Sequence, residues 1–210
     1  MEWLLTGIIL TTFFILGASR LTSCIRVAAA QGVMLSVLPV VARGSLTDPH
    51  SLAMFAGTFL IKGLLIPILL FRSLRESTIR EEMEPTVSRH LSLLAGGCVV
   101  VLAFSWRFPG LPGTHSLLIV PTALAMVLLG FLLLVTRKKA VTQVIGFLVL
   151  ENGVFLFGMT LAADFPMTVE LGVLLDLLVG VFVMGIMIYH INRTFDHIDT
   201  SLMSSLKDTE

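Results

Sequence analysis

Two carboxyl residues lie deep inside apolar stretches of the sequence, where an ionisable side chain is costly. Glu151 lies within residues 141–163, and Asp176 lies within residues 168–191. Placing a carboxyl group at the centre of a bilayer costs at least ~2.5–3.5 kcal/mol, so such residues usually serve a function. We interpret both as proton-transfer groups on a membrane-buried ion path. The alternative is that they stay neutral and form hydrogen bonds for packing only.

Four more polar residues extend this candidate site. Lys62 lies inside the third apolar stretch, and a lysine buried there loses much of its preference for the charged state. It is expected either to exchange protons or to form a structural ion pair with Glu151 or Asp176. Gln31 and Asn152 are auxiliary polar candidates. Arg26 is a third, although its long side chain is expected to reach the cytoplasmic surface.

The elements that position these residues must be membrane helices. The chain has 210 residues, of which 56% are hydrophobic and 13% charged, and its mean hydropathy is +0.96. Soluble domains carry about 25% charged residues, so the composition predicts a polytopic membrane protein within a lipid bilayer. The net charge of zero gives no indication of a nucleic-acid partner.

Seven apolar stretches approach the roughly 17–25 residues that a membrane span needs. They cover residues 3–19, 24–42, 51–71, 91–106, 116–136, 140–163 and 168–191. The first is interpreted as a retained span and not a signal peptide, because Glu2 and no cation precedes it.

The basic residues between the stretches predict the orientation. With seven spans, eleven Lys and Arg residues fall on the side of the C-terminus, and Arg43 and Arg107 fall on the other. Basic residues favour the cytoplasmic side. The N-terminus is therefore expected outside and the C-terminus in the cytoplasm.

A weak internal repeat predicts the layout of the spans. A shift of 117 positions places Arg20 on Arg137, Gly63 on Gly180 and the third stretch on the seventh. The predicted fold is all-α integral membrane, with two parallel three-helix repeats joined by a linker helix. The repeats cover 1–72 and 116–192. The connector, linker span and outer loop cover 73–115, and a cytoplasmic tail covers 193–210.

The second repeat resembles the three-span K subunit of bacterial complex I. A basic turn precedes Ile145, Gly146 and Phe147, with Asn152 following, and Asp176 precedes Gly180 by four residues. The first glutamate of that family would fall at Leu148, whereas this chain carries Glu151. The acid has moved by one helical turn, about 4.5 Å along the axis. By its full layout, the chain is similar to the hydrogenase-4 component E family.

This resemblance implies a non-redox subunit in the membrane arm of an energy-converting hydrogenase or formate hydrogenlyase complex. Its buried carboxylates would translocate protons across the inner membrane of a bacterium or archaeon. The chain itself is expected to bind no cofactor, because the NiFe and Fe-S centres would belong to partner subunits. Those partners would include antiporter-like membrane subunits and a soluble hydrogenase module.

Three other functions stay open at this point. The first is the small subunit of a multisubunit Na+/H+ antiporter. The second is a stand-alone solute transporter, because the three-one-three layout is also that of the SWEET carriers, although the chain contains no Pro-Gln dipeptide. The third is a scaffold whose acids serve assembly alone.

Overall fold

The structure, a computed structural model, describes residues 1–43, 49–76, 88–106, 118–137 and 140–161, together with Gly172 and Gly180. Every regular element in these ranges is a helix. They are α1 (Glu2–Gly17), α2 (Leu21–Arg43), α3 (Pro49–Thr58), η1 (Phe59–Leu65), α4 (Ile66–Glu76), α5 (Arg89–Ser105), α6 (Ile119–Thr136) and α7 (Ala140–Leu161). Since α3, η1 and α4 follow one another without a break, the described chain forms six rods.

These rods overlap the first six predicted spans. Four are long and apolar enough to cross a membrane, over Leu21–Val41, Phe55–Arg72, Ile119–Thr136 and Val141–Met159. Helices α1 and α5 are apolar but shorter. The protein is thus a helical membrane protein. The connector after Glu76, the outer loop, the tail and most of the seventh predicted span lie outside the described residues, although Gly172 and Gly180 are both helical.

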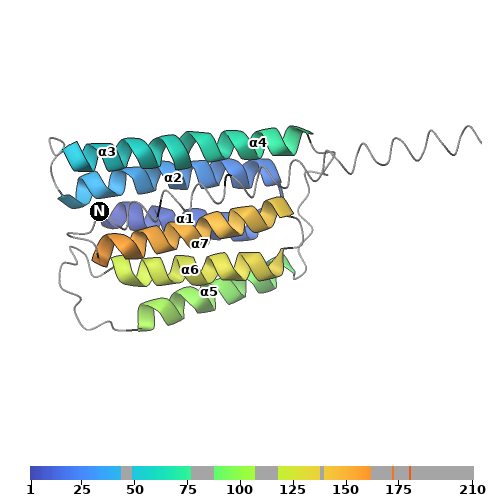
Figure 1. The fold of residues 1–210 in the computed structure, drawn as a ribbon. Coiled ribbons are helices and arrows are strands. Elements are labelled where there is room, and N and C mark those ends of the chain that lie inside the picture. Colours follow the sequence, from blue (N-terminus) through green and yellow to red (C-terminus); the bar gives the residue numbers. More distant parts are fainter. Residues whose placement is uncertain are drawn as a thin grey trace, which may run out of the picture.

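The rods lie side by side and roughly parallel to one common axis (Figure 1). Helices α6 and α7 pack closely, because glycines remove the side chains that would separate them. A Cβ atom at Gly130 would lie 2.5 Å from the Leu150 nitrogen, and one at Gly153 would lie 2.7 Å from the Val127 nitrogen. At Gly146 it would lie 3.0 Å from the Leu133 Cβ. Small residues at such interfaces are typical of membrane helices.

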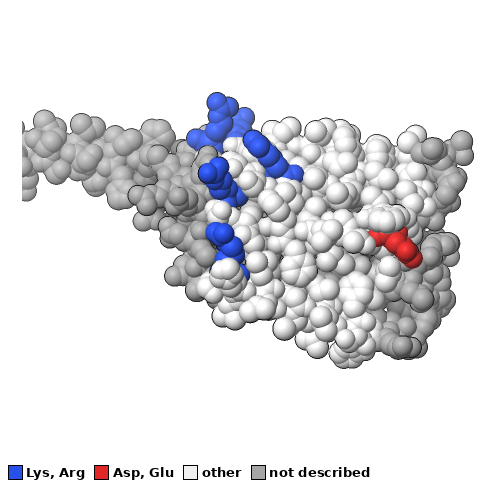
Figure 2. Space-filling model, turned by 180° about the vertical axis from the view of Figure 1, so that it is seen from behind, with Lys and Arg blue, Asp and Glu red and all other residues white. Residues whose placement is uncertain are grey.

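The helix order places one end of α1, α2, α4, α5, α6 and α7 at a common, basic end of the bundle. Figure 2 shows Lys and Arg side chains gathered at one end of the face that it draws. The exposed arginines of this end are Arg20, Arg26, Arg72, Arg75 and Arg89. Arg137 is buried there and donates a hydrogen bond to the carbonyl of Leu16, in the last turn of α1. Burial lowers the pKa of the Arg137 guanidinium from its ordinary value.

Candidate functional site

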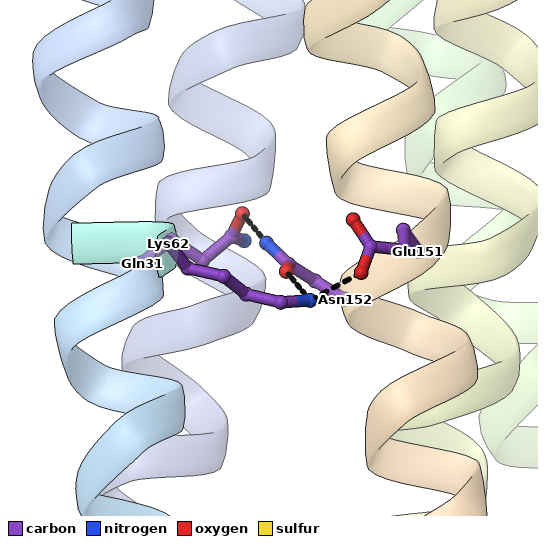
Figure 3. Close-up of polar contacts among 4 residues, drawn as sticks. All are labelled: Gln31, Lys62, Glu151 and Asn152. Carbon is purple, nitrogen blue, oxygen red and sulfur yellow. Dashed lines mark hydrogen bonds and ion pairs between the residues drawn. The ribbon is translucent and has the colours of Figure 1, made fainter. Parts of the chain in front are cut away.

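Four of the six residues singled out in the sequence meet between three helices (Figure 3). Each of the four lies near the middle of its rod. Gln31 comes from α2, Lys62 from η1, and Glu151 and Asn152 from α7. All four are buried, with Lys62 5% and Glu151 1% exposed. The structure therefore joins polar residues of the first half of the chain to those of the second.

An ion pair forms the centre of this cluster. The Lys62 Nζ lies 2.7 Å from the Glu151 Oε1, although 89 residues separate the two in the sequence. The desolvation of two buried charges is repaid only where their geometry is good and further hydrogen bonds satisfy them. Lys62 has such a bond, because its Nζ also donates to the Asn152 Oδ1 at 3.0 Å.

The second carboxylate oxygen of Glu151 stands apart from this arrangement. Among the residues that the structure describes, the buried Oε2 has no hydrogen-bond partner. A buried acceptor without a partner costs free energy, and more so for a charged group. Within the described residues, the ion pair therefore engages one oxygen of Glu151 and leaves the other, Oε2, without a donor.

A chain of hydrogen bonds continues from the ion pair to α1. The Asn152 Nδ2 donates to the Gln31 Oε1 at 3.1 Å. The Gln31 Nε2 lies within hydrogen-bond distance of three acceptors in α1: Thr12 Oγ1 at 2.8 Å, the Ile8 carbonyl at 3.2 Å and Thr11 Oγ1 at 3.3 Å. Four helical segments thus contribute to one polar network inside an apolar bundle.

The backbone around Lys62 departs from the α-helix. Residues Phe59–Leu65 form a π-helix, which closes on a bond from the Ile66 N–H to the Ile61 carbonyl. Such wider turns are rare and often occur at functional sites. Pro67 follows directly, and a proline has no N–H to give to a carbonyl of the preceding turn. This irregular stretch carries Lys62 into the bundle.

Gly32 lets this stretch approach α2. A Cβ atom at position 32 would lie 2.7 Å from the Lys62 carbonyl oxygen and 2.9 Å from the Lys62 Cβ. Real Cβ atoms do not approach other atoms so closely. A glycine is therefore required where α2 and η1 cross, next to Gln31.

A small cavity of about 10 Å³ adjoins the cluster. This is close to the volume that one water molecule needs. Lys62 and Asn152 are its polar lining residues. The apolar ones are Ala28, Ile66, Pro67, Leu70 and Leu148. The helix directions place these apolar residues between the cluster and the basic end.

The remaining two predicted residues are Arg26 and Asp176. Arg26 is exposed near the start of α2 at the basic end. Asp176 lies outside the described residues. Gly172 precedes Asp176 by four residues, and a Cβ atom at Gly172 would lie 3.7 Å from the ring of Phe155. The Lys62 Nζ lies 5.2 Å from the centre of that ring. A cation over an aromatic face at this distance is an attractive contact.

Sequence reasoning missed several residues that build the site. Thr11 and Thr12 lie within the first apolar stretch, where threonine is common. Gly32 and Phe155 are uncharged, so neither was a candidate for proton transfer. A signal did exist at Pro67, because a proline inside a predicted span indicates an irregular helix.

Comparison with curated proteins finds relatives that cover most of the chain. An uncharacterized protein of Mycobacterium tuberculosis is 31% identical over 206 residues, which are 96% of this chain and 93% of the relative. Hydrogenase-4 component E of Escherichia coli is 31% identical over 157 residues, which are 72% of this chain and 71% of that protein. The same component of Shigella flexneri matches equally well. No protein-family model and no solved structure matches the chain.

Proposed function

The chain belongs to the hydrogenase-4 component E family, and we propose that it is a non-redox membrane subunit of an energy-converting hydrogenase complex. In this role it provides two carboxylates, those of Glu151 and Asp176, for proton translocation. Electron transfer takes place in partner subunits, which hold the NiFe and Fe-S centres. The partners include antiporter-like membrane subunits and a soluble hydrogenase module.

The single observation that carries this proposal is the buried Lys62–Glu151 pair with one carboxylate oxygen unsatisfied. The Nζ–Oε1 distance is 2.7 Å, and Oε2 has no partner among the described residues. A scaffold gains little from such a pair, because apolar residues of similar volume often stabilise a fold as well or better. A group that takes up and releases a proton needs an arrangement of this kind, in which the charged and neutral acid are both tolerated.

The proton step follows from the charges around Glu151. With Glu151 ionised, the Lys62 ammonium balances its charge. When an electron arrives in a partner subunit, the added negative charge favours protonation of a nearby carboxylate. The proton binds to Oε2 while Oε1 continues to accept from Lys62. When the negative charge leaves, the carboxyl group releases the proton.

The cavity beside Lys62 supports a proton route from the basic end. It has room for about one water molecule and lies between the cluster and that end. Because basic residues favour the cytoplasmic side, we place this end in the cytoplasm, with the N-terminus outside. The proton is then taken up from the cytoplasm and passed toward Asp176 and the neighbouring subunit.

Helix bounds support the proposed layout of two three-helix repeats. A shift of 117 positions moves α1, residues 2–17, onto 119–134, and α6 covers Ile119–Thr136. The same shift moves α2, residues 21–43, onto 138–160, and α7 covers Ala140–Leu161. The third and seventh spans complete the two repeats in this proposal, with α5 as the linker helix.

The complex membership is tested by affinity purification of the tagged chain from its own membrane. The proposal expects hydrogenase subunits, including one that contains NiFe, to co-purify in fixed proportion. Co-purification of antiporter subunits alone, or uptake of a solute by the isolated chain in liposomes, would contradict it.

The proton role is tested with Glu151→Gln and Asp176→Asn in membrane vesicles that contain the assembled complex. Both variants keep the shape of the side chain and remove its negative charge. We expect assembly to persist and proton translocation per electron to fall by about a hundredfold or more, the lower end of the range that a positioned acid–base group contributes. Glu2→Gln, at a helix end far from the cluster, is the matched control and is expected to translocate normally.

A further inference from the structure

We infer that Gln31 and Thr12 are positioning residues that keep Lys62 protonated, so that Lys62 acts as a fixed counter-charge while Glu151 carries the exchangeable proton. This inference rests on the proposed function and specifies which side chain of the pair carries the proton. It follows from the direction of each hydrogen bond in the chain from Lys62 to α1.

The first bond of this series joins Lys62 to Asn152. The Asn152 carbonyl oxygen Oδ1 lies 3.0 Å from the Lys62 Nζ and accepts a hydrogen bond from it. An amide oxygen can only accept. The amide nitrogen of Asn152 then faces Gln31, and the bond of 3.1 Å is donated by Asn152 Nδ2 to Gln31 Oε1.

The last hydrogen bond of the series ends on the Ile8 carbonyl oxygen, which can accept a hydrogen bond but cannot donate one. With Oε1 facing Asn152, the Gln31 Nε2 faces α1 and donates toward the Ile8 carbonyl at 3.2 Å and toward Thr12 Oγ1 at 2.8 Å. The Thr12 hydroxyl donates to the same Ile8 carbonyl at 2.9 Å, so its oxygen is available to accept. A backbone carbonyl only accepts.

Reversing the direction of these hydrogen bonds would break the bond from Gln31 to the Ile8 carbonyl. A neutral Lys62 amine could accept from Asn152, but Asn152 would then turn its Oδ1 toward Gln31. Gln31 would in turn have to present Oε1 to the Ile8 carbonyl, which would place two acceptors against each other. The bond to the Ile8 carbonyl therefore favours the arrangement in which Asn152 offers an acceptor to Lys62, and that arrangement stabilises the ammonium.

Among the described residues, Glu151 is a titratable group in direct contact with the Lys62 Nζ. The described elements around it, α1, α2, α3, α4 and α7, otherwise carry their charged side chains at helix ends. These are Glu2, Arg26, Arg43, Arg72, Arg75 and Glu76.

In the resulting proton step, Lys62 keeps all its protons. A proton from the cytoplasmic side binds to Glu151 Oε2, and the carboxylate becomes a neutral acid beside a permanent cation. Release of the proton restores the ion pair. No proton passes through Asn152 or Gln31, whose amides serve to hold the acceptor toward Lys62.

The first test replaces Lys62 in the assembled complex. Arginine cannot be deprotonated in proteins, so Lys62→Arg preserves a fixed charge but cannot carry a proton. We expect Lys62→Arg to retain proton translocation. We expect Lys62→Met to lower proton translocation by about tenfold or more, as expected when a neighbouring charge is removed. If both variants assemble and both lose translocation equally, Lys62 is a proton carrier and the inference is overturned.

The second test does not depend on a tolerated arginine. Gln31→Met keeps the volume of the side chain but removes the acceptor that fixes Asn152. We expect translocation to be lost preferentially at alkaline pH, about tenfold, because a hydrogen bond to a charged group has at least that effect on an equilibrium. A merely structural role of Gln31 would lower translocation by one factor at every pH, and that result would overturn the inference. Ser36→Ala is the control, because among the described residues the buried Ser36 hydroxyl bonds within its own helix, at the Val33 carbonyl.

A double-mutant cycle joins the two tests. If Gln31 acts by keeping Lys62 charged, Gln31→Met should lower proton translocation little further in the Lys62→Arg background, where the charge is permanent. The failure of this inference is distinguishable from failure of the proposed function. If only this inference fails, Glu151→Gln still lowers translocation, but Lys62→Arg loses as much translocation as Lys62→Met, and Gln31→Met lowers it by one factor at every pH. If the proposed function fails, Glu151→Gln translocates protons normally.

Discussion

Gly32 lies directly against the backbone of Lys62, so closely that a Cβ atom at position 32 would be 2.7 Å from the Lys62 carbonyl oxygen. The obstruction is backbone, which cannot turn aside as a flexible side chain can. Gly32→Ala should therefore push η1 away from α2 and lengthen the Lys62–Glu151 contact. We expect a loss of about 1–3 kcal/mol of stability, the usual cost of overpacking, measured by thermal unfolding of the purified complex in detergent.

Gly57→Ala is the matched control for this prediction. Gly57 lies in α3, in the same rod as Lys62, and a Cβ atom there would meet nothing within 4 Å. Alanine favours a helix over glycine by up to about 1 kcal/mol, so this variant should be neutral or slightly stabilising. Equal destabilisation by both substitutions would show that the Gly32 contact does not position Lys62.

The position of the carboxylate along α7 can be moved by one turn. Leu148 lines the same cavity as Lys62 and Asn152, one turn before Glu151. We expect Glu151→Leu to abolish proton translocation and the double variant Leu148→Glu/Glu151→Leu to restore part of it, because the carboxylate again reaches Lys62. Translocation is measured with a pH-sensitive dye in vesicles.

A misplaced carboxylate provides the control for that rescue. Val154 is also one turn from Glu151 but is 46% exposed on the outside of the bundle. Glu151→Leu/Val154→Glu should therefore not restore translocation. Rescue by both double variants, or by neither, would mean that proximity to Lys62 does not decide the function.

Cross-linking can test whether the seventh span packs beside the cluster. A Cβ atom at Gly172 would lie 3.7 Å from the Phe155 ring. In a background with Cys24 and Cys98 replaced by serine, Phe155→Cys and Gly172→Cys should be joined by a short bifunctional thiol reagent, detected by a shift on a denaturing gel. Phe155→Cys with Gly180→Cys should not be joined, because no described atom, Phe155 included, lies within 4 Å of a Cβ atom at Gly180. The opposite pattern would place Asp176 away from Lys62.

The proposed orientation makes a labelling prediction. In the same cysteine-free background, a membrane-impermeant maleimide added to intact cells should modify Glu2→Cys. It should modify Arg75→Cys only after the membrane is opened, because Arg75 belongs to the basic end of the bundle. Labelling of Arg75→Cys in intact cells would reverse the assignment of the cytoplasmic side.

The helices themselves were predictable from the sequence. Membrane spans are set by length and apolar composition, which are local properties, so the first six predicted spans overlap the observed rods even where a stretch is short, as at α5. The close packing of α6 and α7 also has a local signal in the sequence. Gly146 and Gly153 leave the surface of α7 that faces α6 without side chains at these two positions.

The pairing of the polar residues was harder to predict from the sequence. The sequence indicated Lys62 and Glu151 as candidates, but either Glu151 or Asp176 was an acceptable partner for Lys62. The observed contact between Lys62 and Glu151 depends on how η1 sits against α2 and α7, and thus on the clearance at Gly32 and the irregular turn before Pro67. Such long-range geometry leaves little trace in local composition. The bond from Gln31 to Asn152 spans 121 residues for the same reason.

The most direct measurement of the central claim is infrared difference spectroscopy of the assembled complex during hydrogenase turnover. A carboxylic acid has a C=O stretching band that the carboxylate lacks, so protonation of a single buried acid can be followed. We predict a band that appears and disappears with turnover, shifts in D2O and is absent in Glu151→Gln. A spectrum in which wild type and Glu151→Gln are identical during turnover, with proton translocation intact in both, would contradict the claim that Glu151 carries the proton.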